Sequence, residues 1–284
     1  MGGRHRDAIA FAIPPIARIP SMSHSSVPVS AVIVCFNEQE LIGECLESVA
    51  FCDEIVIVDS GSTDRTIEII EDFRSKGYPI RLIHRAWTGY ASQKQFALEH
   101  ATMPWLMVVD ADEQIDTDLR KSIREIVQDD GSPISAWQVR RRDWLAGYGL
   151  AHPYVLHNRI LRLFRNGKVR IDPEITIHEM FIVDGPTSLI RSGLLLHMRD
   201  LSLEDDVARA NAYSTQKSSL PANQRVSPST TRLFLTPPYT FIKFYFLKRY
   251  FLCGKPGFIY SMMMMFYSFL TEAKIFRSSL KDDD

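Results

Sequence analysis

The 284-residue sequence lacks the signatures of several common protein classes. No Gly-x-Gly-x-x-Gly turn follows its first apolar strand and no Gly-Lys-Ser/Thr loop occurs, so ordinary dinucleotide-binding dehydrogenases and P-loop enzymes are excluded. The four cysteines form no Cys-x-x-Cys pair, and we expect them to be small buried hydrophobic residues of a protein in a reducing compartment. A net charge of −1 argues against a nucleic-acid-binding protein that acts through its overall charge.

Acidic residues are absent from Val207 to Thr271, a stretch that holds eight Lys or Arg. The first 26 residues contain no continuous apolar signal core, and we expect a disordered extension there. The remaining length suits one large core with an appendage. We therefore predict a globular domain at 27–200, a helical connector at 201–235 and an amphipathic helical tail at 236–284.

From Val29 onward, short apolar runs alternate with amphipathic helical segments. Strands are expected at 30–36, 54–59, 80–83 and 105–110, each followed by a helix, and Asn37 is expected to cap the first of these helices. This alternation implies an α/β fold with a mostly parallel sheet and flanking helices. Ligands bind at the carboxyl ends of the strands in such sheets, and polar side chains gather at those ends here.

The segment Trp105–Glu113, WLMVVDADE, is an apolar strand that ends in three carboxylates within four positions. Side chains two apart in an extended backbone point the same way, so Asp110 and Asp112 are predicted to close on one cation. A divalent ion, Mg²⁺ or Mn²⁺, is the natural partner, and it usually completes its shell with substrate phosphates. The alternative is a solvated acidic turn. Acids at strand ends suit a metal-bridged nucleotide-sugar better than a free dinucleotide.

Four segments in order carry a family resemblance: Val34–Glu38, Val58–Asp64, Gln93–Leu98 and Val109–Glu113. Over roughly residues 28–200 the chain resembles the family 2 inverting glycosyltransferases, which have the Rossmann-like GT-A fold. Three later segments, Arg162–Gly167, Ile177–Glu179 and Leu196–His197, resemble the branch of bacterial lipopolysaccharide-core β-glucosyltransferases. The resemblance implies metal-dependent transfer of a hexose from a UDP-sugar to a hydroxyl of a membrane-associated glycolipid or lipopolysaccharide-type acceptor. The loop Ala146–Tyr154 departs from that branch, so the acceptor's identity does not transfer.

The resemblance also implies roles for single residues. Asp59 is expected to bind the nucleotide base, Asp110 the ribose side of the donor, and Asp112 the metal. His197 is a candidate second metal ligand, or else a structural histidine. Further donor contacts are expected from Asn37, Glu38, Asp64 and Lys94. The structural alternatives are helix capping by Asn37 and Asp59, a favourable position of Asp64 at the positive end of its helix, and a solvated surface position for Lys94.

Glu179 is the candidate general base, because the attacking acceptor hydroxyl must lose its proton as the new bond forms. The alternative is a sheet-edge glutamate paired with Arg162 or Arg165.

Two other functions of the protein remain possible from the sequence. A nucleotidyltransferase has a similar sheet, although it normally shows a glycine-rich basic loop after the first strand. A catalytically inactive nucleotide-sugar-binding membrane protein is the second.

The tail is rich in aromatic residues: 13 of the 26 Phe and Tyr lie between Phe234 and Phe269. Its uncharged run from Pro256 to Thr271 would extend about 24 Å as a helix, short of the roughly 30 Å hydrocarbon core of a bilayer. We therefore predict a peripheral protein whose tail binds the anionic cytoplasmic face of the inner membrane. The alternative is a helical pair packed on the catalytic domain or on a second subunit of an oligomer.

Overall fold

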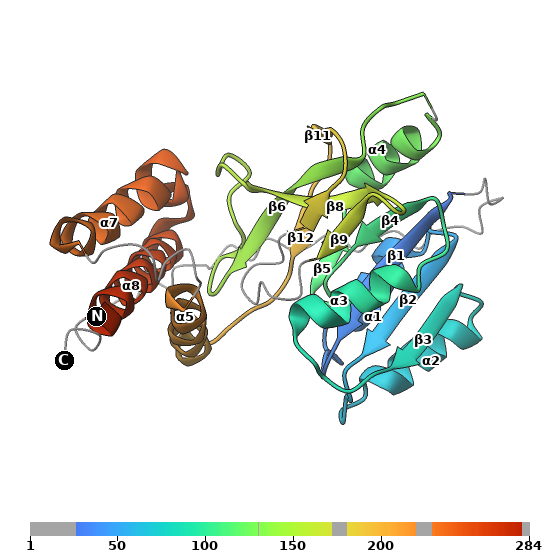
Figure 1. Ribbon diagram of the computed structural model, residues 1–284, viewed down its shortest axis with the longest axis horizontal. Helices are drawn as coiled ribbons and strands as arrows, with labels where there is room; N and C mark the ends of the chain where they lie inside the picture. Colours follow the sequence, from blue (N-terminus) through green and yellow to red (C-terminus); the bar gives the residue numbers. More distant parts are fainter. Residues whose placement is uncertain (1–26, 130, 172–180, 220–228, 280–284) are drawn as a thin grey trace, which may run out of the picture.

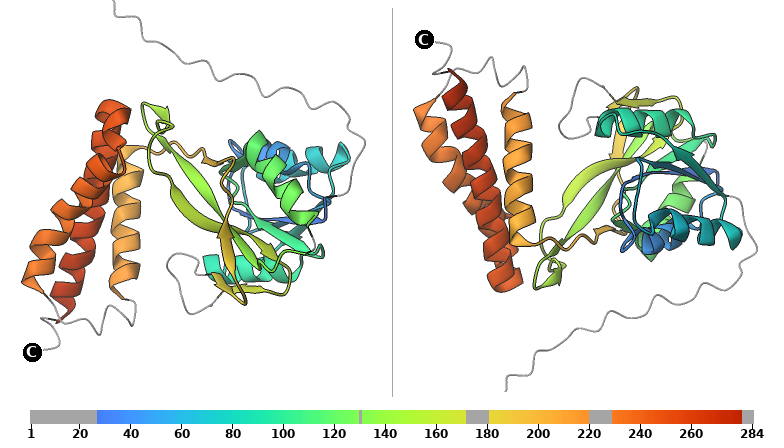
Figure 2. Two further views of the ribbon diagram at one scale, coloured as in Figure 1. Left: turned by 90° about the horizontal axis from the view of Figure 1, so that it is seen from above. Right: turned by 90° about the horizontal axis from the view of Figure 1, so that it is seen from below.

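The computed structural model describes residues 27–129, 131–171, 181–219 and 229–279 (Figure 1). The chain forms an α/β domain, followed by a unit of three long helices. Figure 2 shows these helices side by side at one end of the molecule, with part of the sheet reaching toward them.

The first half of the sheet consists of four parallel strands. In spatial order they are β3 (Ile80–His84), β2 (Glu54–Asp59), β1 (Val29–Cys35) and β4 (Trp105–Val108). The aliphatic and β-branched runs of β1, β2 and β4 are buried on both faces of the sheet, as expected for parallel strands, whereas the edge strand β3 is only partly buried. Side chains alternate along β1, so that Val29, Ala31 and Ile33 belong to one core layer and Val32 to the other.

Helices cover both faces of this half. On one face lie α1 (Ile42–Val49), α2 (Thr66–Ser75) and α4 (Thr117–Val127), and on the other lies α3 (Tyr90–Glu99). The carboxyl ends of β1, β2 and β4 consequently lie at one edge of the sheet, between the two helix layers (Figure 1). This edge is where ligands bind in α/β sheets.

The second half of the sheet is mixed. Beyond β4 the order is β8 (Asn158–Arg165), β6 (Ala136–Leu145), β12 (Leu195–His197) and β5 (Glu113–Ile115). β8 is antiparallel to β4 and β6, and β12 is parallel to β6 but antiparallel to β5. The β12–β5 pairing sets His197 opposite Glu113 and therefore brings the end of β12 to the acidic residues after β4. Short strands complete the domain, namely β7 (Gly149–Leu150), β9 (Val169–Ile171), β10 (Phe181–Val183) and β11 (Thr187–Leu189).

The helical unit follows β12. Its elements are α5 (Leu203–Ser218), α7 (Thr230–Ile242), a π-helical turn η1 (Lys243–Leu247), a 3₁₀ turn η2 (Tyr250–Cys253) and α8 (Gly254–Ser279). Lys274 of α8 donates to Ser214 of α5 at 2.8 Å, and Arg232 of α7 pairs with Glu272 of α8 at 2.8 Å. Phe244 and Tyr250 pack on Leu145, which joins the unit to β6.

The predicted α/β fold with flanking helices and an aromatic-rich helical tail is confirmed. The proposed boundary between residues 235 and 236 falls inside α7, and the division into domains stays a prediction. The capping role of Asn37 is wrong, because α1 begins at Ile42 without a side-chain cap among the described residues. Asn37 instead adopts a positive φ of 54°, a conformation that asparagine tolerates, and its Oδ1 accepts from Thr63 N at 2.8 Å.

Candidate active site

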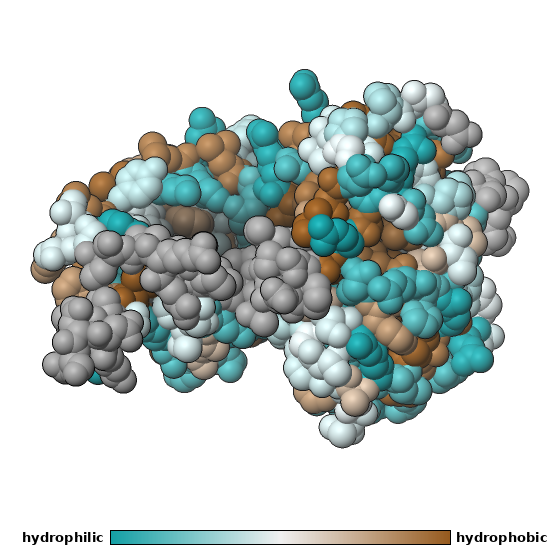
Figure 3. Space-filling view, viewed as in Figure 1, coloured by the Kyte–Doolittle hydropathy of each residue, from teal (hydrophilic) through white to brown (hydrophobic). Residues whose placement is uncertain are grey.

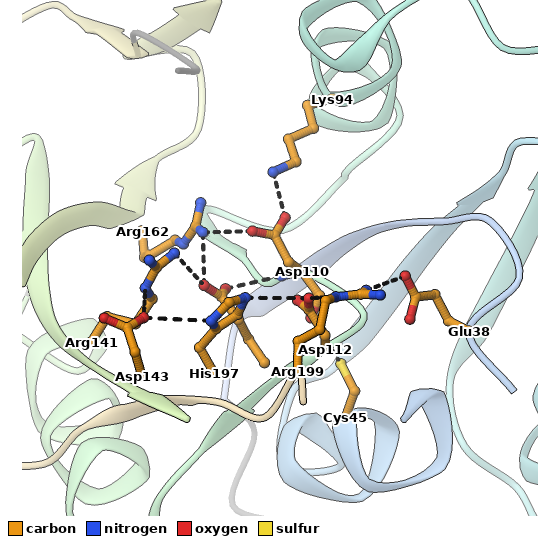
Figure 4. Close-up of polar contacts among 11 residues, drawn as sticks. Glu38, Cys45, Lys94, Asp110, Asp112, Arg141, Asp143, Arg162, His197 and Arg199 are labelled. Atoms are coloured by element: carbon orange, nitrogen blue, oxygen red, sulfur yellow. Dashed lines mark hydrogen bonds and ion pairs between the residues drawn. The ribbon is translucent and has the colours of Figure 1, made fainter. Parts of the chain in front are cut away.

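Charged side chains from six parts of the chain converge beyond the carboxyl ends of β1 and β4 (Figure 4). The β1–α1 loop contributes Glu38, and the turn after β4 contributes Asp110 and Asp112. The other contributors come from α3, β6, β8 and the end of β12, namely Lys94, Arg141, Asp143, Arg162, His197 and Arg199. Acids and bases alternate throughout this cluster, so most of the buried charge is compensated by ion pairs.

The backbone after β4 is a turn rather than an extended strand. β4 ends at Val108, and Glu113 N donates to Asp110 O at 2.8 Å. The expectation that Asp110 and Asp112 point the same way on a strand is therefore wrong. The turn directs the two carboxylates toward different cations (Figure 4).

Asp110 lies between two buried cations. It pairs with Lys94 Nζ through Oδ1, and Arg162 Nη2 donates to its Oδ2 at 2.7 Å. Burial opposes ionisation of Asp110, but Lys94 and Arg162 outweigh it and hold the pKa well below its usual range. Lys94 is only 3% exposed, so the alternative of a solvated surface lysine is wrong. Arg162 also donates to Glu113 at 2.9 Å.

Asp112 contacts the end of β12. His197 Nε2 lies 3.3 Å from Asp112 Oδ2, and His197 Nδ1 lies 3.4 Å from Asp143 Oδ1. Burial opposes protonation of His197, but the two carboxylates outweigh it and raise the pKa of His197 to about 9. Burial likewise opposes ionisation of Asp112, but His197 and Arg199 stabilise its anion and lower its pKa to about 2. His197 is thus a cation at neutral pH, and it must lose a proton before it ligates a metal.

Arg199 joins the two loops that flank the site. Its Nε donates to Asp112 Oδ2 at 2.5 Å, and its Nη2 pairs with Glu38 Oε1. Burial raises the pKa of Glu38, an effect that Arg199 opposes. The sequence contains no motif that singles out Arg199, Arg141 or Asp143, so the sequence-based prediction of the site missed all three.

The remaining predicted donor residues organise the turns after β1 and β2. Asp59, 1% exposed, accepts from Gly61 N at 3.0 Å and from Ser62 N at 3.1 Å. Burial opposes its ionisation, but these hydrogen bonds keep its pKa below the usual value. Asp64 accepts from Thr66 N at 3.0 Å and from Gln39 N at 3.1 Å, and so it ties the two turns together.

A pocket of about 500 Å³ opens beside these turns, lined by Val34, Cys35, Phe36, Glu38, Trp87 and Tyr90. The three aromatic residues are about half exposed, at 54%, 48% and 53%. The rings of Trp87 and Tyr90 meet edge to face, with centroids 4.6 Å apart. Exposed rings around an open pocket suit a flat ligand with both apolar faces and polar edges.

The predicted base, Glu179, lies outside the described residues. Of its two alternative partners, Arg165 stacks over the Trp105 ring at 4.5 Å and donates to Ser132 O at 2.8 Å. Arg162 contributes to the Asp110 cluster. The structure therefore leaves the role of Glu179 as a prediction.

The side chains of this cluster can hold a divalent ion only together with a bound ligand that supplies phosphate oxygens. Among the described residues, no three or more His, Cys, Asp or Glu side chains gather as a ligand set. Mg²⁺ and Mn²⁺ need fewer protein ligands, because one or two carboxylates suffice when phosphate oxygens complete the shell. Arg199 already places a positive charge between Asp112 and Glu38, so this position favours a cation.

Comparisons with known proteins place this architecture in a family. The glycosyl transferase family 2 model matches residues 30–194. The lipopolysaccharide core biosynthesis glycosyltransferase LpsC of Rhizobium meliloti is 42% identical over 256 residues, which cover 90% of this chain and 94% of LpsC. An uncharacterized glycosyltransferase of Rickettsia typhi is 28% identical over 262 residues, 89% of this chain and 88% of its own.

Among solved structures, the mannosyltransferase PcManGT of Pyrobaculum calidifontis, in complex with GDP-Man and Mn²⁺, superposes with a TM-score of 0.55. Its sequence is 14% identical, and the match covers 91% of this chain and 88% of PcManGT, so the likeness concerns the fold. The family model covers more than half of the chain and agrees with the likeness to LpsC over most of its length. This chain is therefore a member of glycosyl transferase family 2, and it is a glycosyltransferase.

Proposed function

We propose that the enzyme transfers a hexose from a UDP-sugar to a hydroxyl of a lipopolysaccharide-type glycolipid, with inversion at the anomeric carbon and with a divalent metal. The observation that carries the proposal is that Arg199 links the Asp110–Asp112 turn to the aromatic pocket, because it pairs with Asp112 and with the pocket residue Glu38. The names of LpsC and PcManGT support the acceptor class and the use of a nucleotide-sugar with Mn²⁺, respectively.

The parts of the donor are proposed to bind successive residues along this edge of the sheet. The pocket with Phe36, Trp87 and Tyr90 receives the base, with Asp59 nearby at the end of β2. The ribose hydroxyls donate to Asp110, which Lys94 and Arg162 keep ionised. Asp112, assisted by His197, would hold the metal. A bound metal supplies positive charge that stabilises the departing diphosphate.

Glu179 is proposed to accept the proton of the acceptor hydroxyl. As the acceptor oxygen bonds to the anomeric carbon, the bond from that carbon to the diphosphate oxygen breaks, and UDP leaves with the electron pair. Attack from the opposite side inverts the anomeric configuration.

We further propose that the helical unit docks on the anionic inner face of the cytoplasmic membrane, where a lipid-carried acceptor is presented. None of the described helices is long and apolar enough to cross a bilayer. Large apolar side chains are nevertheless exposed across the unit (Figure 3), including Phe234, Leu235, Tyr239, Phe246, Leu247 and Ile259 at 53% to 69%. Exposed cations lie nearby, where anionic headgroups would bind them: Lys243 in η1, Arg249 between η1 and η2, and Lys255 in α8.

The test combines a cellular and a purified system. Mass spectrometry of lipopolysaccharide from cells lacking the enzyme should show a truncated core, and the purified enzyme should add one hexose to that material from a UDP-sugar. Nuclear magnetic resonance of the product reports the anomeric configuration. If the enzyme instead releases pyrophosphate from UTP and a sugar 1-phosphate and forms the UDP-sugar, it is a nucleotidyltransferase. Binding of the UDP-sugar without turnover would establish the inactive alternative.

A further inference from the structure

We infer that Arg199 is a movable cation that occupies the metal position of the unliganded enzyme and binds the donor diphosphate once a metal has taken its place. The inference rests on the proposed donor and metal chemistry. It makes Arg199 a donor-binding residue, and it predicts that metal and nucleotide bind cooperatively.

The geometry places Arg199 where a metal would compete with it. Figure 4 shows its guanidinium lying between Asp112 and Glu38. Arg199 and His197 both contact Oδ2 of Asp112. An ion ligated by that oxygen would lie about 2.1 Å from it, and Arg199 Nε already lies 2.5 Å from the same oxygen. Two cationic side chains already share this oxygen, so a metal held by it and by His197 would take the place of Arg199.

The position of Arg199 in the chain allows this displacement. It lies in the link between β12 and α5, and its side chain is 23% exposed, so both solvent and ligand reach it. The neighbouring Met198 N stays bonded to Asp112 O at 2.9 Å, which anchors the link on one side. The side chain can therefore swing while the backbone beside it stays in place.

The donor diphosphate is a suitable partner for the displaced Arg199 guanidinium. Arginine presents planar pairs of donors that match phosphate oxygens, and such bonds are among the strongest in proteins. In the unliganded enzyme, ion pairs with Asp112 and Glu38 keep Arg199 close to the proposed position of the diphosphate leaving group.

Cooperativity follows from this exchange. Metal alone binds weakly, because it must break the Arg199–Asp112 pair without compensation. UDP offers Arg199 a new anion, so each ligand raises the affinity of the other. Bonds between the metal and the diphosphate couple the two ligands in any case, and the exchange adds a part that depends on Arg199. A residue that merely tied the two loops together would add no such part.

The experiment measures Mn²⁺ binding by electron paramagnetic resonance of the free ion, with and without UDP, and UDP binding by calorimetry in saturating Mn²⁺. Arg199→Gln should bind Mn²⁺ alone about fivefold more tightly than wild type and bind UDP about tenfold more weakly, within the usual range of coupling between sites. The matched control is Arg74→Gln on α2, which removes the same charge from an exposed i,i+3 pair with Glu71 and should behave like wild type.

A second variant guards against a folding defect. Arg199→Lys keeps the cation, so its affinity for Mn²⁺ alone should stay near that of wild type, while its affinity for UDP falls less than in Arg199→Gln. Arg199→Gln affinities that fall for both ligands, or stay unchanged for both, would overturn the inference and leave the proposed function intact. A wild-type enzyme that binds UDP but no Mn²⁺ in its presence would overturn the proposed metal chemistry, and the inference with it.

Discussion

Replacement of Lys94 by methionine should destabilise the fold by removing the charge that lies against Asp110. Methionine keeps most of the length and volume of the lysine side chain, so the change acts on charge rather than on packing. Loss of one partner of a buried ion pair costs about 3–5 kcal/mol. Arg162 still donates to Asp110 Oδ2 at 2.7 Å, and we therefore expect a smaller loss of about 2–3 kcal/mol, near that of a charged hydrogen bond.

The assay is urea unfolding at pH 7, followed by circular dichroism, with Lys76→Met as the control. Lys76 also pairs with an aspartate, Asp72 at 2.6 Å, but on the surface of α2, where side-chain exposure exceeds half and no measurable change is expected. The pKa of Asp110 is lowered in the fold, so the stability that its ion pairs provide is present at neutral pH and lost as the pH falls below about 4. A Lys94→Met loss no larger than that of the control would refute this reasoning.

Four further predictions concern the site and the helical unit. Asp112→Asn should abolish sugar transfer while circular dichroism stays native; wild-type turnover that persists in excess chelator would contradict the metal role. Glu179→Gln should lower turnover by roughly 10²–10⁴-fold with UDP affinity unchanged by calorimetry, and near-normal rates would place the base elsewhere. In the metal-free enzyme, His197→Gln should lower the free energy of unfolding most below about pH 6.5 and progressively less up to about pH 9, because the pKa of His197 is raised in the folded state. Urea unfolding at several pH values measures this, and a destabilisation that grows with pH would contradict the raised pKa. Replacing Lys243, Arg249 and Lys255 by Gln should reduce flotation with anionic liposomes, whereas wild-type protein that stays soluble, together with loss of a dimer on deletion of the tail, would identify an oligomer interface instead.

The structure determines which basic residues of the tail should be replaced in the liposome experiment. Lys248 is one of the four basic residues that the sequence places among the tail aromatics, but it is half-buried and donates to Asn158 at 2.5 Å. Its Nζ also lies 4.7 Å from the Phe244 ring centroid. Replacement of Lys248 would disturb the contact between the helical unit and β8, so it is left out of the set.

Local patterning in the sequence determined the elements of the parallel half and the position of the acidic turn. Strands β1 to β4 appear where short apolar runs predict them, since strand burial depends on side chains a few residues apart. The family motifs are local as well, and the family assignment from them is confirmed. In the tail, composition predicted aromatic helices, but packing decided that Phe244 and Tyr250 are buried while Phe246 and Phe251 are exposed.

Only the tertiary structure decided the electrostatics of the site. Arg162 and Asp110 are 52 positions apart, Arg199 and Asp112 are 87 apart, and Arg199 and Glu38 are 161 apart. Pairs at such separations leave no periodic trace in the sequence, because the sheet order that brings β8 and β12 to the acidic turn creates them. Burial then makes these pairs strong, since a charge away from water must be compensated by another. The sequence therefore determined which acids stand at the strand ends, and the fold decided which cations hold them.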